Sequence, residues 1–457
     1  MATVSEEGSG QVLRSERIAG GILPKVLNSF DMVAIFVAIV LFLTGSMLCG
    51  AAQSMAELIL FRALQGLGAG GLLVLAQAAI GDVVSPRERP RYQGLFTGTF
   101  ALASVAGPLL GGFITSALSW RWVFYVNLPV GGLALAMIAL GLRGRPTGQK
   151  RSIDYAGSVL LTGATATLLL LLAWGGIEFP WFSPESAGLV AVTVGLVALF
   201  IRQELRSPEP LIRLALFRNR VFARGVAVGG MMAFAMLGST VFLPLYFQLV
   251  FGMDPAVAGM MLLPQVIGML LSSVIGGRIV THLGRNKPFL LAGLGLEAVA
   301  LGSLAVFAYI AASSHIFLVS MAALGLGMGM GMPNLTTAVQ NAVAYRELGA
   351  ATGAMSFARS LGGALGVATS GTIMSSRLAT AMTGGGARLD LGALSQQGVQ
   401  ALAHLTPSQQ AGISAAYRTA LTGCFLLSGV VMTVAFIQVL GLPERTLRSE
   451  IEEARVS

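Results

Sequence analysis

Long apolar runs separated by short polar segments are the main pattern along this chain. A helix of about 20 apolar residues crosses the roughly 30 Å hydrocarbon core of a bilayer. Because the apolar residues are continuous rather than alternating with polar ones, the runs predict membrane-spanning helices and not strands. Twelve such runs follow one another, at residues 31–52, 57–81, 92–117, 122–142, 155–176, 185–203, 222–250, 256–280, 288–310, 316–343, 350–375 and 414–440.

The composition agrees with this pattern. Of the 457 residues, 55% are hydrophobic and 11% are charged, whereas soluble proteins carry about 25% charged residues. That leaves too little polar surface to cover soluble domains of this combined length. The composition therefore excludes a soluble enzyme, a disordered scaffold and an ordinary nucleic-acid-binding protein. It predicts an all-helical polytopic membrane protein.

The basic residues predict how the chain lies across the membrane, because lysine and arginine gather on the cytoplasmic side. If the N-terminus is cytoplasmic, 23 of the 29 basic residues fall in inside segments, four fall outside and two lie within helices. The six exceptions are Arg121, Arg377, Arg388, Arg418, Arg62 and Arg359. We therefore expect a cell-membrane protein with both termini in the cytoplasm. The net charge of +9 then reflects orientation and attraction to lipid headgroups, not nucleic-acid binding.

The sequence contains no pattern that predicts a metal or a cofactor. Cys49 and Cys424 lie inside apolar runs, where a thiol acts as a small apolar side chain, and the three histidines are scattered. A formal G-x-G-x-x-G begins at Gly66, but it lies inside a membrane run and not after a strand, which excludes a dinucleotide site. The sequence carries neither a Walker loop nor a hydrolytic motif, so we expect neither an enzyme nor an ATP-driven pump.

Arg62 is a charged residue within the second apolar run, in LILFRALQGLGAGG. A charge near the bilayer centre costs about 2.5–3.5 kcal/mol on insertion scales, so such a side chain usually faces a cavity or a partner. Gln65 lies three positions later, on the same face of the helix. Two interpretations stay open: Arg62 faces a functional cavity, or it snorkels toward the cytoplasmic end and braces a neighbouring helix.

Glycines repeat through the third run, GLFTGTFALASVAGPLLGG. Glycines four positions apart let two helices approach closely, and a proline kinks a helix. This run therefore predicts close helix packing around Gly94, Gly107, Pro108, Gly111 and Gly112.

With these segments the chain resembles the major facilitator superfamily, and within it the fourteen-helix drug:proton antiporters of the EmrB/QacA type. Arg62 to Gly70 resembles the motif whose arginine takes part in proton coupling, and Gly94 to Gly112 resembles the antiporter signature. The segments WRWVFYVNLPVGG, LPLYFQLVFGMDPAVAGMMLLP, GLGMGMGMPN and RSLGGALGVA continue the resemblance. GGRIVTHLGRNK is similar to a cytoplasmic gating loop of the family, which implies a gating role for Gly277, Gly284 and Arg285.

The resemblance implies a proton-driven exporter of drugs or other amphipathic small molecules, working by alternating access around a cavity at the bilayer midplane. Its partners would be the substrate, protons and the lipid bilayer, and the proton gradient would take the place of a cofactor. Arg62 would steer proton release, and the segment from Gly107 to Gly112 would seal the outer side by tight packing. A metabolite exporter or facilitator of the same fold is the alternative.

The resemblance also implies a domain plan. We expect a polar cytoplasmic N-terminus, an N-terminal bundle, two extra central spans with a cytoplasmic linker, a six-helix C-terminal bundle with a long outer loop, and a cytoplasmic tail. The boundaries are 1–30, 31–142, 143–221, 222–440 with the loop at 376–413, and 441–457. Within the outer loop, residues 391–405 predict an amphipathic surface helix.

Several polar residues interrupt the spans of the second half. Glu297 is either a protonatable coupling site or a neutral acid bonded to a neighbouring helix, and Arg359 either braces helices or sets the electrostatics of a cavity. Four further side chains are candidates for orienting a substrate in an apolar cavity, or for bonding between helices: Tyr246, Gln248, Asn334 and Gln340. Gln65 belongs to the same candidate cavity.

The first predicted span aligns with the third helix of the resembled family, and about 30 polar residues precede it. Twelve spans in a 4 + 2 + 6 arrangement therefore stand where the family has fourteen. Because the family's first helix lines the central cavity, we expect this chain alone to be poorly stable or inactive, with a start that is misassigned, frameshifted or truncated. A transport-incompetent remnant is thus a further alternative.

Overall fold

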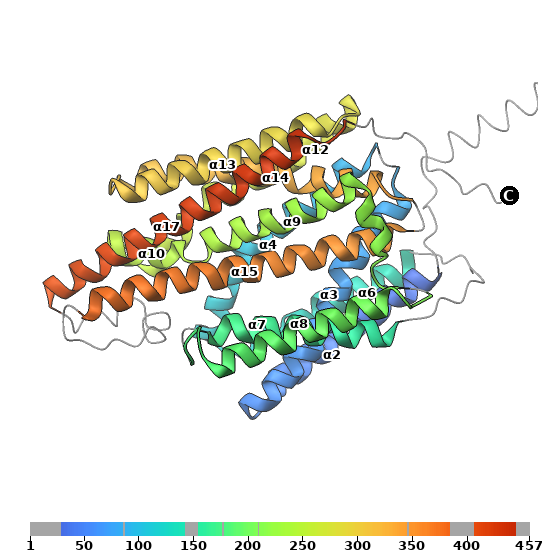
Figure 1. The fold of residues 1–457 in the computed structure, drawn as a ribbon, viewed down its shortest axis with the longest axis horizontal. Helices are drawn as coiled ribbons and strands as arrows, with labels where there is room; N and C mark the ends of the chain where they lie inside the picture. The colour runs from blue at the N-terminus through green and yellow to red at the C-terminus, as the bar shows by residue number, and fades with distance from the viewer. Residues whose placement is uncertain are drawn as a thin grey trace, which may run out of the picture. The chain divides into compact units, whose positions relative to one another are not determined.

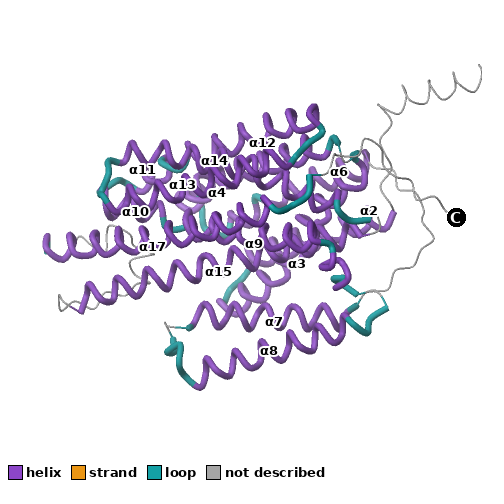
Figure 2. Tube along the Cα trace, turned by 45° about the horizontal axis from the view of Figure 1, so that its top comes forward, coloured by secondary structure: helices purple, strands orange, loops and turns teal. Residues whose placement is uncertain are grey.

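The computed structural model describes residues 29–85, 87–141, 154–175, 178–208, 210–344, 347–383 and 406–444. These residues form helices and connecting loops, with a single isolated bridge between Gly175 and Phe179 and no other strand pairing in the described ranges (Figure 2). The all-helical prediction is confirmed for this part of the chain. The predicted surface helix at 391–405, almost all of the polar N-terminus and most of the tail lie outside the described residues.

Ten helical stretches among the described residues are long and apolar enough to cross a membrane, and they coincide with ten of the twelve predicted spans. The other two predicted spans are also helices, α4 (Arg89–Ala117) and α15 (Leu348–Thr383), which are 29 and 36 residues long and rich in glycine, serine and threonine. Helices α15 and α17 (Pro407–Leu440) both extend farther into the predicted outer loop than expected.

Three predicted spans contain a break that the sequence prediction did not include. Helix α5 (Trp122–Tyr125) is followed by α6 (Asn127–Gly141), α9 (Arg220–Thr240) by α10 (Leu243–Phe251), and α11 (Pro255–Met260) by α12 (Leu263–Leu283). Each break precedes a proline near the start of the second helix, at Pro129, Pro244 and Pro264. Proline has no N–H to donate to the preceding turn and restricts the residue before it, so the hydrogen-bond ladder stops there.

The helices form two compact units, and the first comprises Met1–Val83 and Phe113–Gln149. Its described helices are α2 (Ser29–Ala51), α3 (Met55–Val83), α5 and α6. Helices α2 and α3 touch along their backbones: a Cβ built at Gly45 would lie 2.5 Å from Gln65 N, and one built at Gly68 would lie 2.7 Å from Phe42 Cα. Both positions therefore require glycine for the two helices to come this close.

The second unit comprises Val84–Gly112 and Lys150–Ser457, so it includes most of α4. Its other elements are α7 (Tyr155–Trp174), α8 (Pro184–Glu204), the short 3-10 helix η1 (Leu214–Arg218), α9 to α12, α13 (Lys287–Tyr309), α14 (Ser314–Asn341), α15 and α17. In Figure 1, α9 lies beside α15, and α13 lies beside α14 and α17. The apolar core lies among these helices and includes Leu294, Leu301, Leu335 and Phe425, all of which are fully buried. The predicted boundaries between domains stay a prediction.

Helix α14 is held on two sides by glycine contacts. A Cβ at Gly325 or Gly329 would strike the backbone of α12 at Gln265 and Met269, whereas one at Gly327 would lie 2.7 Å from the carbonyl oxygen of Gly293 in α13. At about 100° per residue, the pair Gly325 and Gly329 points almost opposite to Gly327. Helix α14 is therefore packed between α12 and α13, with backbone contacts on both sides.

Polar side chains fix several helix starts and loop positions. Asp154 caps α7 by accepting the backbone N–H of Gly157 at 2.8 Å, and this hydrogen bond is the main reason that the pKa of Asp154 lies below its ordinary value. Asn219 caps α9 by accepting the N–H of Val221 at 3.0 Å. Such caps satisfy backbone donors that have no partner inside the helix.

Candidate functional site

Polar side chains from α2, α3 and the start of α6 meet inside the first unit. Gln65 donates from Nε2 to Ser46 Oγ at 3.1 Å, and Asn127 donates from Nδ2 to the same oxygen at 3.0 Å. Ser46 donates in turn to the carbonyl oxygen of Phe124 at 2.8 Å. Gln65 and Ser46 are buried, so these groups satisfy one another within apolar helices. We call Arg62, Gln65, Ser46 and Asn127 the α3 network.

Gly45 explains how this network forms. It precedes Ser46 in α2, and its missing side chain lets the backbone of Gln65 lie against it. The close approach places the amide of Gln65 within hydrogen-bonding distance of the Ser46 hydroxyl. The close packing of α2 against α3 and the polar network between them therefore depend on the same two turns, around Gly45 and Gln65.

Arg62 lies at the edge of the α3 network. Its Nη1 donates to Gln65 Oε1 at 3.4 Å, and its guanidinium carbon lies 4.8 Å from the centroid of the Phe124 ring. The negative face of an aromatic ring attracts a cation in this position. The prediction that Arg62 and Gln65 share one helix face is confirmed. The role of Arg62 in proton coupling stays a prediction.

Three further members of this site, Ser46, Asn127 and Phe124, were not predicted from the sequence. Asn127 had a usable signal, because it is a polar amide within the apolar segment WRWVFYVNLPVGG. Ser46 and Phe124 had none, since single serines and phenylalanines are common in membrane helices and their neighbours cannot be read from the sequence.

The glycine-rich helix α4 contacts α12 within the second unit. A Cβ at Gly94 would strike the carbonyl oxygen of Ser273, and a Cβ at Gly277 would lie 2.5 Å from the carbonyl oxygen of Pro90. Arg87 adds two hydrogen bonds, donating to the carbonyl oxygens of Thr281 at 3.3 Å and His282 at 3.4 Å. The candidate residues Gly94 and Gly277 are far apart in sequence, but both lie in the contact between α4 and α12.

In the second part of the antiporter motif, an added side-chain carbon would not collide with a described neighbouring helix. A Cβ built at Gly107, Gly111 or Gly112 would meet no described heavy atom within 4 Å. The side chain of Pro108 is not among those the structure describes. The tight outer seal expected from Gly107 to Gly112 stays a prediction.

The predicted gating loop joins α12 to α13. Gly284 ends α12 in the left-handed conformation, with φ of 68°, which glycine adopts without strain. Arg285 pairs with Glu444 at 3.8 Å, and both side chains are exposed. Lys287 donates to the carbonyl oxygen of Leu442 at 2.6 Å, so the loop is fastened to the end of α17. Its gating role stays a prediction.

Glu297 lies in α13 with its side chain against the glycines of α14. It is 1% exposed, and its Oε1 has no hydrogen-bond partner among the described residues. A Cβ at Gly327 would lie 2.7 Å from Glu297 Cγ, and a Cβ at Gly331 would lie 3.1 Å from Glu297 Oε1. The described residues provide no hydrogen bond to this oxygen from a neighbouring helix. The role of Glu297, as a coupling site or as a neutral acid bonded to a neighbour, stays a prediction.

Arg359 crosses from α15 to α14. Its Nη2 donates to Thr336 Oγ1 at 2.8 Å and to the carbonyl oxygen of Met332 at 3.4 Å, while its buried Nε has no partner among the described residues. A Cβ at Gly229 of α9 would lie 3.7 Å from Arg359 Nε. Arg359 thus braces α14 from α15 and also places an unpaired N–H against α9, so both interpretations keep some support.

The four polar residues predicted to line a substrate cavity do not gather at one place. Gln248 donates to the carbonyl oxygen of Pro244 in its own helix at 3.3 Å, and Gln340 donates to Thr352 of α15 at 3.2 Å. Asn334 donates to Met330 in its own helix at 2.7 Å, and its carbonyl oxygen accepts from Asn286 at 3.2 Å. Tyr246 lines a separate pocket near the turn between α13 and α14. Their cavity role stays a prediction.

Residues 32–367 match a family model described as Major Facilitator Superfamily. The chain is 37% identical over 346 residues to the multidrug transporter protein MdtP of Bacillus subtilis, covering 76% of this chain and 63% of that protein. It is 34% identical over 336 residues to multidrug resistance protein 3 of the same species, covering 73% and 65%. An uncharacterized MFS-type transporter of Mycobacterium tuberculosis is 36% identical over 423 residues, covering 91% and 61%.

The chain therefore spans less than two thirds of the length of these relatives. Among solved structures, the human organic anion transporter MFSD10 matches with a TM-score of 0.56 and 16% identity, over 88% of this chain and 77% of that one. The xylose transporter XylE from E. coli, in a partially occluded inward open conformation, matches with a TM-score of 0.51 and 13% identity, over 91% and 81%. At such low identity these structures show a shared fold and nothing more.

Proposed function

The chain belongs to the Major Facilitator Superfamily, and we propose that it is a proton-coupled exporter of drugs or other amphipathic small molecules. We also propose that it belongs to the fourteen-helix EmrB/QacA branch. The names of its two Bacillus relatives, a multidrug transporter and a multidrug resistance protein, support the choice of substrate class.

The α3 network carries the proposal. Arg62 holds a positive charge in an apolar helix, and its bonding partners there are the neutral amide of Gln65 and the ring of Phe124. A charged residue within a membrane helix is energetically costly, and such residues usually mark a functional site. Arginine stays protonated at physiological pH, so Arg62 is a fixed positive charge and does not itself carry the proton.

A fixed positive charge favours the ionised form of a nearby acid, and so promotes proton release. In the proposed mechanism Arg62 has this role within the first unit, and proton binding in the second unit is assigned separately. Glu297 is the acid that lies in the middle of a described span, where one carboxyl oxygen has no bonding partner, and we assign it to proton binding. Alternating access would open and close the contact between α4 and α12, which Arg87 fastens through carbonyl oxygens at the C-terminal end of α12.

A transport assay in proteoliposomes tests the proposal. Cationic and neutral amphipathic drugs, and a matched panel of metabolites, are loaded with and without an imposed pH difference. We expect drug transport that requires the pH difference in the full chain, and its loss in Arg62→Gln and Glu297→Gln. Arg121→Gln is the matched control, because Arg121 is also an arginine of the first unit that contacts an aromatic ring, 4.6 Å from Trp120, but it lies outside the α3 network.

Three results would contradict the proposal. Transport of metabolites alone would favour the metabolite exporter, and drug transport that is indifferent to the pH difference would favour a facilitator. A folded chain that transports nothing, with intact binding of drugs, would favour the transport-incompetent alternative.

A further inference from the structure

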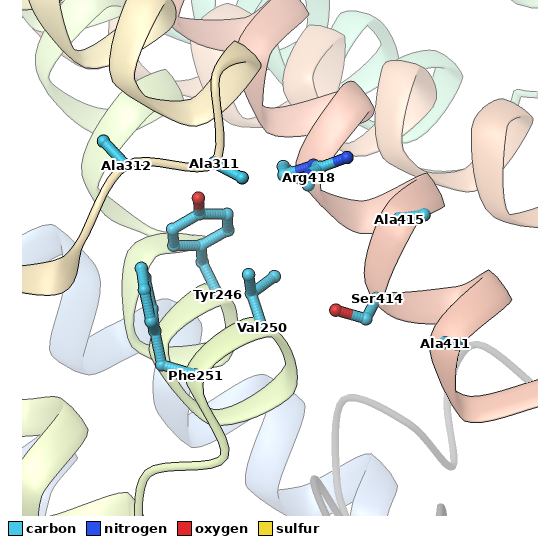
Figure 3. Close-up of a pocket in the computed structure, with 9 residues that line it drawn as sticks. All are labelled: Tyr246, Val250, Phe251, Ala311, Ala312, Ala411, Ser414, Ala415 and Arg418. Carbon is cyan, nitrogen blue, oxygen red and sulfur yellow. The ribbon is translucent and has the colours of Figure 1, made fainter. Parts of the chain in front are cut away.

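The second unit contains a pocket that lies outside both the α3 network and the contact between α4 and α12. It has a volume of about 340 Å³ and lies where the end of α10, the turn between α13 and α14, and the start of α17 come together (Figure 3). Ligand pockets are usually about 300–1,000 Å³, so this one suits a small ligand. The turn at Ala311 is at the opposite end of α13 from the predicted gating loop.

The base of the pocket is aromatic. Tyr246 is fully buried, and its ring centroid lies 5.7 Å from Phe251 and 5.4 Å from Phe317. Val250 and several alanines complete the apolar lining. Figure 3 shows the ring of Tyr246 between Phe251 and the Ala311–Ala312 segment, with Ser414 and Arg418 on the side of α17. An apolar part of a ligand would be held against these rings.

The hydroxyl of Tyr246 has no hydrogen-bond partner among the described residues, although it is buried. Buried tyrosine hydroxyls normally find a partner, because an unpaired one loses its hydration without compensation. The nearby Tyr417 follows the rule and donates to the carbonyl oxygen of Phe242 at 3.1 Å. The unpaired hydroxyl of Tyr246 at the pocket therefore points to a group that a ligand would supply.

The polar groups around the pocket favour an anion. Arg418 supplies a permanent positive charge with several N–H donors, and Ser414 and Tyr246 supply hydroxyls. Among the described residues, the lining of the pocket includes no aspartate or glutamate. Guanidinium groups bind oxyanions such as carboxylate, sulfonate and phosphate through paired hydrogen bonds. A cationic ligand would meet repulsion here and no compensating charge from the lining.

The position of the pocket in the membrane indicates that its ligand also has an apolar part. Tyr246 lies in the last turns of the span Arg220–Phe251, and Ser414 and Arg418 lie in the first turns of the span Gln409–Leu440. The pocket is therefore at the level where a bilayer changes from hydrocarbon to headgroups, and a ligand entering there has one apolar end and one polar end.

The backbone beside the pocket is also in a less common conformation. Ala311 has φ of 52°, in the left-handed region. Its backbone N–H donates to the carbonyl oxygen of Ala308, and the N–H of Ala312 donates to the carbonyl oxygen of Phe307 at 2.9 Å. This is the arrangement that usually ends a helix at a glycine. An alanine at this position places a methyl group on the pocket wall at a cost of about 1 kcal/mol or more.

We propose that this pocket binds an amphipathic anion, with its oxyanion at Arg418, Ser414 and Tyr246 and its apolar body on the aromatic base. Two sources share this chemistry: a soluble aryl or alkyl carboxylate, and an anionic lipid. The proposal does not depend on transport, because binding requires no gradient.

The test uses the full chain in nanodiscs of neutral phosphatidylcholine. In the first arm, 2-naphthoate is titrated by calorimetry, with neutral 2-naphthalenemethanol for comparison. In the second arm, native mass spectrometry counts retained phosphatidylglycerol. We expect Arg418→Gln to weaken binding in at least one arm by about tenfold, as expected for the loss of a charge-assisted hydrogen bond. Tyr246→Phe should weaken it less, and Ala415→Phe should block the pocket by filling it.

Arg377→Gln is the matched control, since Arg377 is an exposed arginine near the end of α15 and does not line the pocket. If the pocket variants lose naphthoate binding but retain the lipid, the ligand is a soluble anion. If they lose the lipid but still bind naphthoate, the ligand is a lipid headgroup. Either result supports the proposal. Absence of binding in both arms, equal effects of Arg377→Gln and Arg418→Gln, or equal affinity for naphthoate and the neutral alcohol would overturn it. Tyr246→Phe keeps the shape of the ring, so its thermal stability serves as the check that the variant is folded.

Discussion

The glycine contacts of α14 predict a large difference between two otherwise identical substitutions in α13. A Cβ added at Gly293 would lie 2.7 Å from both Gly327 O and Gly331 N, and 3.1 Å from Gly331 Cα. All three atoms belong to the backbone of α14, so none can move without moving the helix. At Gly302, on the same helix, an added Cβ would meet nothing within 4 Å in the described part of the chain. Gly302→Ala is therefore the matched control for Gly293→Ala.

The magnitude follows from the distances. Ordinary contact begins at 3.4 Å, so Gly293→Ala must separate α13 from α14 by about 0.7 Å at this level. A gap of this size forfeits about a quarter to a half of an apolar contact, and each contact contributes about 0.1–0.2 kcal/mol. For roughly 30 atom pairs the loss is about 1–3 kcal/mol. Both variants gain the same helix propensity, up to about 1 kcal/mol, so their difference isolates the packing loss.

The two cysteines provide the assay. Cys49 is fully buried in the first unit and Cys424 is fully buried in the second. A dye that fluoresces on reaction with a thiol therefore reports unfolding, and in a Cys49→Ser background it reports the second unit through Cys424 alone. Gly293→Ala should unfold several degrees below Gly302→Ala. Equal midpoints, or a higher midpoint for Gly293→Ala, would refute the conclusion that α14 touches α13 backbone to backbone.

Three further predictions concern the loops and caps. The hydrogen bond from Gly157 lowers the pKa of Asp154. The contribution of Asp154 to stability is therefore complete above the ordinary aspartate pKa and is lost as the pH falls through the lowered value. Asp154→Asn should remove this part of the pH dependence of thermal unfolding. Ala311→Gly should raise stability by about 0.5–1 kcal/mol, since it relieves a left-handed alanine, and a lower unfolding midpoint would contradict this. An impermeant maleimide should label Glu88→Cys only from the cytoplasmic side and Phe182→Cys only from the outside, both positions being exposed; the reverse would invert the predicted orientation.

Local spacing allowed part of the α3 network to be predicted. Arg62 and Gln65 are three residues apart on one helix, and they are hydrogen-bonded as expected. Phe124 contacts the same arginine but lies 62 residues later in the sequence, and Ser46 lies in a different helix. The helix period places neighbours within one helix, whereas the neighbours between helices depend on packing that one sequence does not specify.

The hydropathy pattern located the spans but not their breaks. Pro129, Pro244 and Pro264 each lie just after an interruption, and their effect is on the backbone, which a count of apolar residues does not register. The segment GLGMGMGMPN contributed to the family resemblance, but the sequence did not predict that its glycines contact two different neighbouring helices. Tyr246 was expected to line a central cavity, and no sequence signal placed it with Arg418, which lies 172 residues away.

The glycine contacts of α14 also bear on how freely this sequence can vary. At Gly325, Gly327 and Gly329 any side chain would collide with a neighbouring backbone or side chain, so those sites should tolerate almost no substitution in a saturation screen. Leu326 and Met328 lie between them and Met330 follows Gly329, and the two methionines have flexible side chains that adapt to altered neighbours. Two classes of position, fixed and adjustable, therefore alternate along one helix. Sequence change in this helix should be concentrated at the methionines.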